Sequence, residues 1–284
     1  MAVLLALLAS LSWGMSDFVA AVKARQYPLL LVLAVSQPAG MLVLAVPLIV
    51  RGEPLVADGR LLAAVAAGFG SVLALGFLYY AMANGRIVVV APVAATGAVL
   101  PVAFGIIRGD SVSAVGLAGM VLALGGAAAA AVESGPADGQ PANWLGTAAA
   151  FASAVSLGFF FTMLDIAGQC DPFWATFVTR LTACAAVLLL VLARRARSAT
   201  SGRPSRYRNW SALAVIGICD AAAEISFATA STAGQLETAS VLSSLYPVVT
   251  VVLAVVLLHE RMRPLQIVGS VGALAGVILV AHAT

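Results

Sequence analysis

Long apolar stretches separated by short polar breaks dominate this chain. A helix that crosses a hydrocarbon core of about 30 Å needs roughly 20 apolar residues. Ten stretches are about that long: Ala2–Val22, Leu29–Val50, Leu61–Ala83, Ile87–Ile107, Ser111–Val132, Asn143–Gly168, Phe173–Ala193, Asn209–Ala233, Leu236–Leu258 and Pro264–His282. The breaks contain turn formers, as in Gln26-Tyr27-Pro28 and Asp171-Pro172. The pattern predicts an all-α integral membrane protein with ten transmembrane helices.

The second half of the chain resembles the first. Shifts of 150 residues, and of 144 for the first two helices, superpose similar positions. The pairs are Gly119 and Gly269, Leu124 and Leu274, Gly126 and Gly276, Asp110 and Glu260, Gly97 and Pro247, Gly14 and Gly158, and Pro28 and Pro172. We therefore expect five-helix repeats over 1–132 and 143–284, joined by a polar linker over 133–142. An odd number of spans inverts the second copy, and inverted repeats are typical of secondary transporters with a midplane substrate site.

Composition excludes a soluble fold. The chain is 62% hydrophobic and 10% charged, with a mean hydropathy of +1.05, whereas a soluble domain is about 25% charged. The net charge of +3 lies mainly in short connectors, so it gives no argument for nucleic-acid binding. A multi-pass location in the cytoplasmic membrane follows as the expectation, with the lipid bilayer as the surrounding partner.

Motifs for enzyme chemistry are missing from the sequence. It contains no HExxH, no Walker A loop and no dinucleotide fingerprint. The two histidines, His259 and His282, lie near span ends, and the three cysteines show no CxxC or zinc-ligand spacing. We therefore expect no enzyme, no metal and no cofactor.

Glycines and prolines suggest which helices pack closely and which bend. Gly272 and Gly276 form a GxxxG pair, which lets membrane helices approach each other. We interpret these glycines as packing positions within one subunit; a monomer is expected, with a dimer as the alternative. Pro92, Pro101 and Pro247 each remove a backbone hydrogen bond, so we expect them to bend the spans over 87–107 and 236–258 around a cavity.

Ionisable side chains within spans are the main site candidates, because a charge in the bilayer is costly. Arg180 lies within the span over 173–193. Asp220 and Glu224 are four residues apart, so they share one helix face with Phe227. Three further carboxylates, Asp17, Asp165 and Glu237, lie nearer to span ends.

Two interpretations of the charges remain open. In the first, Glu224 and Asp220 line a cavity and one of them takes up the proton that drives transport, while Arg180 holds a substrate carboxylate or phosphate. In the second, Arg180 forms a fixed ion pair with one of these carboxylates inside the bundle.

Aromatic and hydroxyl groups supply the remaining substrate-site candidates. Trp13 lies deep in the first span and could stack against a substrate. Tyr246 and Ser243 flank Pro247, where a hydroxyl group could contact a substrate or bond to a backbone carbonyl instead.

The chain resembles the drug/metabolite transporter superfamily, specifically its ten-helix EamA type. The resemblance rests on Ser12-Trp13-Gly14, on Gly85 through Ala91-Pro92 to Pro101, on Ser243-Ser244-Leu245-Tyr246-Pro247 with Thr250, and on Glu260-Arg261, Gln266 and Gly269. One departure is that the acidic–basic pair after the fourth helix is reduced to Gly109-Asp110-Ser111. The resemblance implies a carrier that exports or exchanges small organic metabolites without an ATPase, with both termini in the cytoplasm.

Loop charges give the opposite orientation. The loops after helices 1, 3, 5, 7 and 9 carry eleven Lys and Arg residues, and the others carry three, so the positive-inside rule places both termini outside. The sequence leaves orientation, coupling ion, transport direction and substrate open. It predicts a secondary transporter for a small metabolite, such as an amino acid or drug, with a non-transporting membrane scaffold or regulatory protein as the alternative.

Overall fold

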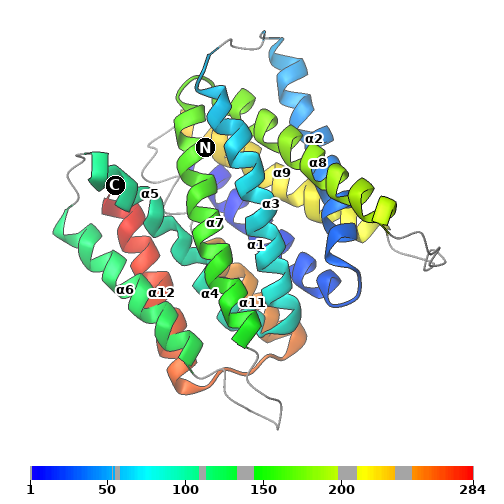
Figure 1. The fold of residues 1–284 in the computed structure, drawn as a ribbon. Coiled ribbons are helices and arrows are strands. Elements are labelled where there is room, and N and C mark those ends of the chain that lie inside the picture. Colours follow the sequence, from blue (N-terminus) through cyan, green and yellow to red (C-terminus); the bar gives the residue numbers. More distant parts are fainter. Residues whose placement is uncertain are drawn as a thin grey trace.

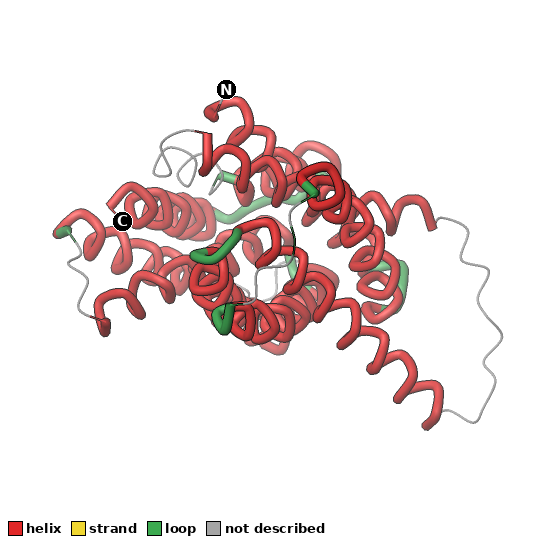
Figure 2. The backbone as a smooth tube through the Cα atoms, turned by 90° about the horizontal axis from the view of Figure 1, so that it is seen from above, coloured by secondary structure: helices red, strands yellow, loops and turns green. Residues whose placement is uncertain are grey.

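The protein is all-helical throughout the part of the chain that the computed structural model describes. The described residues are 2–52, 54, 58–108, 113–132, 144–197, 210–233 and 245–283. Helices, drawn red in Figure 2, make up most of this backbone, and it contains no strand. The expectation of an all-α fold is therefore confirmed for the described residues.

Each of the ten apolar stretches contains helix in its described part, as Figure 1 shows. The elements are α1 (Ala2–Ala24), α2 (Leu29–Arg51), α3 (Leu61–Asn84), α4 (Ile87–Ala95), the 3₁₀ turn η1 (Thr96–Ala98), α5 (Val99–Arg108), α6 (Ala114–Val132), α7 (Trp144–Gly168), α8 (Pro172–Arg197), α9 (Trp210–Ala233), α11 (Tyr246–Leu258) and α12 (Pro264–Ala283). The expected linker over 133–142 lies outside the described residues.

Helix length divides these elements into two groups. Helices α1, α2, α3, α7, α8 and α9 are long and apolar enough to cross a membrane. The other predicted spans contain shorter apolar helices over 87–101, 114–130, 246–258 and 264–280. Ten crossing helices therefore stay a prediction, while six candidate spans are observed.

The outside of the bundle is covered by large aliphatic side chains. Ile49, Val50 and Ile107 are 78%, 80% and 83% exposed. A soluble monomer rarely exposes so many apolar groups together. A bilayer solvates this surface, in agreement with a multi-pass membrane protein.

The span expected over 87–107 is interrupted at the 3₁₀ turn η1, between Pro92 and Pro101. Proline cannot donate a backbone hydrogen bond to the residue four positions earlier, so Pro92 leaves the Val88 carbonyl free. The Ser270 hydroxyl of α12 donates to that carbonyl at 3.4 Å. Pro247 lies in the first turn of α11, where a missing N–H costs little. The part of its expected span before residue 245 lies outside the described residues.

Corresponding helices of the two halves have corresponding contacts in the opposite half. Helix α3 packs along α7 and α8. Its counterpart in the second half is α9, which packs along α1 and α2. Likewise, α4 contacts α7 as α11 contacts α1. The pairs α2–α8, α4–α11 and α6–α12 join counterparts directly. A two-fold relation between the halves requires this arrangement of contacts.

Two glycines illustrate the same reciprocity in detail. A Cβ atom added to Gly14 of α1 would lie 2.8 Å from the Tyr246 carbonyl oxygen of α11. One added to Gly158 of α7 would lie 2.7 Å from the Gly97 carbonyl oxygen of η1. Backbone thus meets backbone at both places, which only glycine permits.

Helices α6 and α12 form a closely packed pair at one edge of the bundle (Figure 1). Added Cβ atoms at Gly119 and Gly126 of α6, and at Gly269 and Gly276 of α12, would each collide with backbone of the opposite helix. Gly272 has more room, because its Cβ would stand 3.6 Å from the Gly126 Cα. The glycines of this pair act as packing positions within the subunit.

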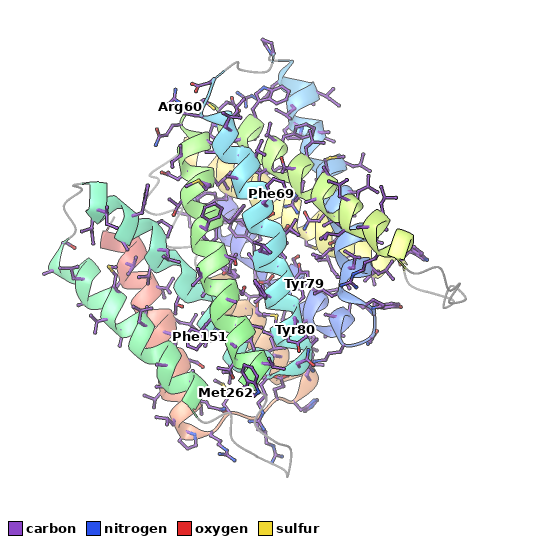
Figure 3. The ribbon with its side chains drawn as sticks, in the orientation of Figure 1. Arg60, Phe69, Tyr79, Tyr80, Phe151 and Met262 are labelled. Carbon is purple, nitrogen blue, oxygen red and sulfur yellow. The ribbon has the colours of Figure 1, made fainter. Side chains whose placement is uncertain are left out.

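An ion pair closes one end of the bundle, the end where Figure 3 labels Met262. Arg25, after α1, donates from Nη2 to Glu260 Oε1 and to the Gly85 carbonyl, both at 3.0 Å. Glu260 Oε2 also accepts from the Val88 backbone N–H at 3.2 Å, at the start of α4. Arg25 therefore links the connection after α1 to the α3–α4 and α11–α12 connections, which come from both halves of the chain.

A similar fastening involves the end of α2. Arg51 Nη2 donates to Asp171 Oδ2 at 3.1 Å, and its guanidinium carbon lies 4.6 Å from the centre of the Phe173 ring. Asp171 Oδ1 accepts from the Trp174 backbone N–H at 2.8 Å, which caps the first turn of α8.

Replacing Arg25 with glutamine should lower the free energy of unfolding by about 1–2 kcal/mol, because a half-buried ion pair is lost together with the bonds to the Gly85 carbonyl and, from Nε at 3.3 Å, to the Met82 carbonyl. Thermal unfolding of the purified protein in detergent, followed by tryptophan fluorescence, measures the change. Arg60→Gln is the matched control. Within the described residues, Arg60 bonds to the half-buried Asp58 two residues away and, by those bonds, holds the pKa of Asp58 below its ordinary value. Equal midpoints for the two variants would contradict a fastening role for Arg25.

Candidate functional site

Arg180 lies at the centre of a polar cluster inside the bundle. Its side chain is 5% exposed, and it extends from α8 between α2 and α9. Nη2 donates to Asp220 Oδ2 at 2.7 Å and to Glu224 Oε1 at 2.5 Å. Nη1 donates to Gln37 Oε1 at 3.0 Å. The arginine therefore joins three helices through charge-assisted bonds.

The four-residue spacing on α9 accounts for the shared bond. Residues i and i+4 lie on one face of a helix, so the carboxylates of Asp220 and Glu224 both reach one guanidinium nitrogen. Of the two open interpretations of Arg180, this geometry corresponds to the ion pair. The second oxygen of Glu224, Oε2, is buried and has no hydrogen-bond partner in the described part of the chain.

Gln37 is a member of this cluster that the sequence analysis did not identify. It is 2% exposed in α2, and a primary amide in an apolar span must find a polar partner. The signal was present in the dipeptide Ser36-Gln37 within an otherwise aliphatic run. Only the packing of α2 against α8 shows that its partner is Arg180.

Three aromatic rings lie next to the charged cluster. The Trp13 ring of α1 is centred 5.9 Å from that of Phe227 and 6.1 Å from that of Tyr246. Phe227 follows Glu224 by three residues, so it continues the charged face of α9. The structure thus brings the candidates Trp13 and Tyr246 together with the α9 residues, at a junction of α1, α9 and α11.

Asp17 also lies beside this cluster. It follows Trp13 by one helical turn, and the neighbouring Ser16 hydroxyl donates to the Ile216 carbonyl of α9 at 2.9 Å. The Ser16 bond places this turn of α1 against the middle of α9, and Asp17 interacts electrostatically with Asp220 there.

Tyr79 is the nearest hydroxyl-bearing ring of α3. It is 2% exposed and interacts electrostatically with Asp17, Asp220 and Arg180. Tyr80, the next residue, is 40% exposed, and Figure 3 labels both. Tyr79 therefore belongs to the interior of the bundle, and Tyr80 to its surface. The candidate Ser243 lies outside the described residues.

Several residues of the sequence resemblance have structural roles. The Thr250 hydroxyl donates to the Gly14 and Tyr246 carbonyls, both at 3.2 Å, and so fastens α11 to α1. Gln266 Oε1 accepts from the Arg263 backbone N–H at 3.1 Å before the first turn of α12. These contacts support the bundle around the cluster rather than forming part of it.

Two hollows in the described surface are lined by apolar side chains. One is lined by Leu117, Val121 and neighbours on α6, and another by Leu42, Val46 and neighbours on α2 with Ile225 of α9. Both are apolar and face outward, as expected for lipid-filled grooves. Within the described residues, no three His, Cys, Asp or Glu side chains gather closely enough to hold a metal ion.

Comparisons with known proteins agree with this architecture. A family model described as "EamA-like transporter family" matches residues 1–132 and 144–282. A solved structure titled only "Crystal structure of protein" is similar over 98% of this chain and 95% of its own, with a TM-score of 0.66 and 19% sequence identity. That likeness concerns the fold alone. Among curated proteins, none matches significantly.

Proposed function

The chain belongs to the EamA-like transporter family, and from that premise we propose that it is a secondary carrier for a small organic solute, working by alternating access. Membership makes it a membrane transporter of the drug/metabolite kind. Export or exchange is the proposed direction, across the cytoplasmic membrane. The substrate would bind at the junction of α1, α9 and α11, beside Arg180.

One observation carries the proposal: a bonded group of charges in the middle of apolar helices. Removing an ion from water costs several kcal/mol even after relaxation. Hydrophobic side chains of similar size would stabilise a purely structural bundle at least as well. Intramembrane charges of this kind typically mark a substrate or proton pathway.

The proposed architecture has ten crossing helices in two inverted repeats. The reciprocal partners of α3 and α9 support this arrangement, as do the two separate matches of one family model. Rocking of one half against the other would then expose the cluster to each side in turn. The fastenings at Arg25–Glu260 and Arg51–Asp171 would have to open in such a cycle.

Protons are the proposed coupling ion, with Glu224 as the carrier and Asp220 as its partner. Glu224 is the better candidate, because its Oε2 atom has no hydrogen-bond partner in the described residues. A non-transporting scaffold is the rival function, and it gives no role to a free carboxylate oxygen beside three aromatic rings.

Transport by the purified full chain in liposomes tests the proposal. A mixed metabolite pool is supplied with and without a pH gradient, and mass spectrometry identifies the solutes that accumulate. We expect one solute class to accumulate at least tenfold more with the gradient, and Glu224→Gln to abolish that dependence. Asp58→Asn, outside the spans, is the control. A pool from which nothing moves would contradict the carrier and favour the scaffold.

A further inference from the structure

Negative charge exceeds positive charge in the buried cluster. Its interacting charged groups are Arg180 of α8, Asp220 and Glu224 of α9, and Asp17 of α1. The other titratable side chains near them are neutral in their ordinary forms: Tyr79, Tyr246, Cys184 and Cys219. Among the described residues, the cluster thus holds one guanidinium, bonded to two carboxylates, and a third carboxyl group that interacts with Asp220, so it has up to two unbalanced negative charges.

Such an excess cannot persist in an apolar interior. The mutual repulsion of like charges grows as the dielectric constant falls, and each unpaired ion costs several kcal/mol. A proton or another cation must therefore accompany the carboxylates.

Arg180 is poorly placed to receive an anionic substrate. Its terminal nitrogens already donate to two carboxylates and to the Gln37 amide, at 2.5–3.0 Å. A substrate carboxylate or phosphate would have to displace one of these groups and would add a further negative charge.

The open positions around the cluster suit a positive group instead. Glu224 Oε2 is a buried acceptor without a hydrogen-bond donor among the described residues. The Trp13 ring is centred 5.9 Å from the Phe227 ring and 6.1 Å from the Tyr246 ring, and Tyr246 interacts electrostatically with Asp17. Aromatic faces attract an ammonium group within about 6 Å, most strongly where water is excluded.

We propose that the substrate of this carrier is an organic cation, an amine or quaternary ammonium on an apolar body, held by the Glu224 and Asp17 carboxylates and the Trp13, Tyr246 and Phe227 rings. The inference rests on the proposed function and names its substrate class. The three rings would pack against the apolar body of the substrate. Among the described residues, the carboxylates are not grouped as a three-ligand metal site, which favours an organic over a metallic cation. Bound protons and the bound cation would exchange at the same carboxylates.

Two probes of similar size and opposite charge test the substrate class. Binding of benzyltrimethylammonium and of 3-phenylpropionate to the detergent-purified full chain is measured by calorimetry. The cation should bind at least tenfold more tightly than the carboxylate. Glu224→Gln and Asp17→Asn should each weaken cation binding at least tenfold, and Trp13→Leu on the order of fivefold to thirtyfold. Asp58→Asn should leave it unchanged.

Proton release provides a readout that needs no variant. Addition of the cation to weakly buffered protein should acidify the solution, because the bound cation displaces protons from the carboxylates. Tighter binding of 3-phenylpropionate, or cation binding with neither proton release nor sensitivity to Glu224→Gln, overturns the inference. If the liposome experiment detects a neutral or anionic substrate and the cation does not bind, the carrier function stands and the inference falls. If no solute moves there, both fall.

Discussion

Replacing Arg180 with methionine should lower the free energy of unfolding by about 3–5 kcal/mol, the largest effect of any single charge in this protein. The change removes the only positive group that bonds to Asp220 and Glu224 in the described structure. Both carboxylates would then be buried without a counter-ion. Chemical unfolding in mixed detergent, followed by helix content, measures the loss.

A compensating variant separates charge from packing. Arg180→Met combined with Asp220→Asn and Glu224→Gln removes all three charges and keeps the side-chain volumes similar. It should recover most of the lost stability, because neutral replacements of a buried ion cluster are often well tolerated. An Arg180→Met protein as stable as the parent, or a triple variant as unstable as the single one, would contradict the fixed ion cluster.

The second large effect is expected at the contact between α6 and α12. Gly126→Val should lower the free energy of unfolding by 3 kcal/mol or more, at the upper end of the range of about 1–3 kcal/mol for overpacking. Its new Cβ would lie 2.6 Å from the Gly269 carbonyl oxygen and 2.7 Å from the Gly272 carbonyl carbon. Backbone atoms cannot rotate away, so the two helices would have to separate. Size-exclusion profiles and thermal midpoints in detergent report the change.

Gly125→Val is the matched control for this prediction. Gly125 precedes Gly126 in the same helix, yet nothing lies within 4 Å of a Cβ added there. The two substitutions share helix propensity and added apolar area, so the difference between them isolates the interhelical contact. Equal midpoints would show that α6 and α12 do not pack as closely as described.

The sequence predicted local features well, because they depend on composition along the chain. The ends of α2, α3 and α12 fall within two residues of the expected bounds. The glycines of α6 and α12 could be recognised as packing positions from their spacing. Pro92 was expected to disturb its helix, but its freed carbonyl bonds to Ser270, and a partner almost two hundred positions away leaves no local signal.

The site was harder to predict, for the same physical reason. Asp220 and Glu224 could be assigned to one helix face, since that follows from helical geometry. Whether Arg180 met them or a substrate depended on which helices become neighbours. Gln37 and Asp17 join the cluster through the packing of α2 on α8 and of α1 on α9. Hydropathy along one span carries no information about either contact.

The reciprocal packing of the halves also has a consequence for biosynthesis. Helices α1, α2 and α3 have their most extensive contacts with α7, α8 and α9 rather than with one another. A ribosome delivers the first three helices to the membrane long before their neighbours exist. Until then, the alanine-rich inner faces of these helices must contact lipid instead of protein. The first three helices acquire these contacts only when α7, α8 and α9 arrive, so a truncated first half would be a substrate for membrane quality control.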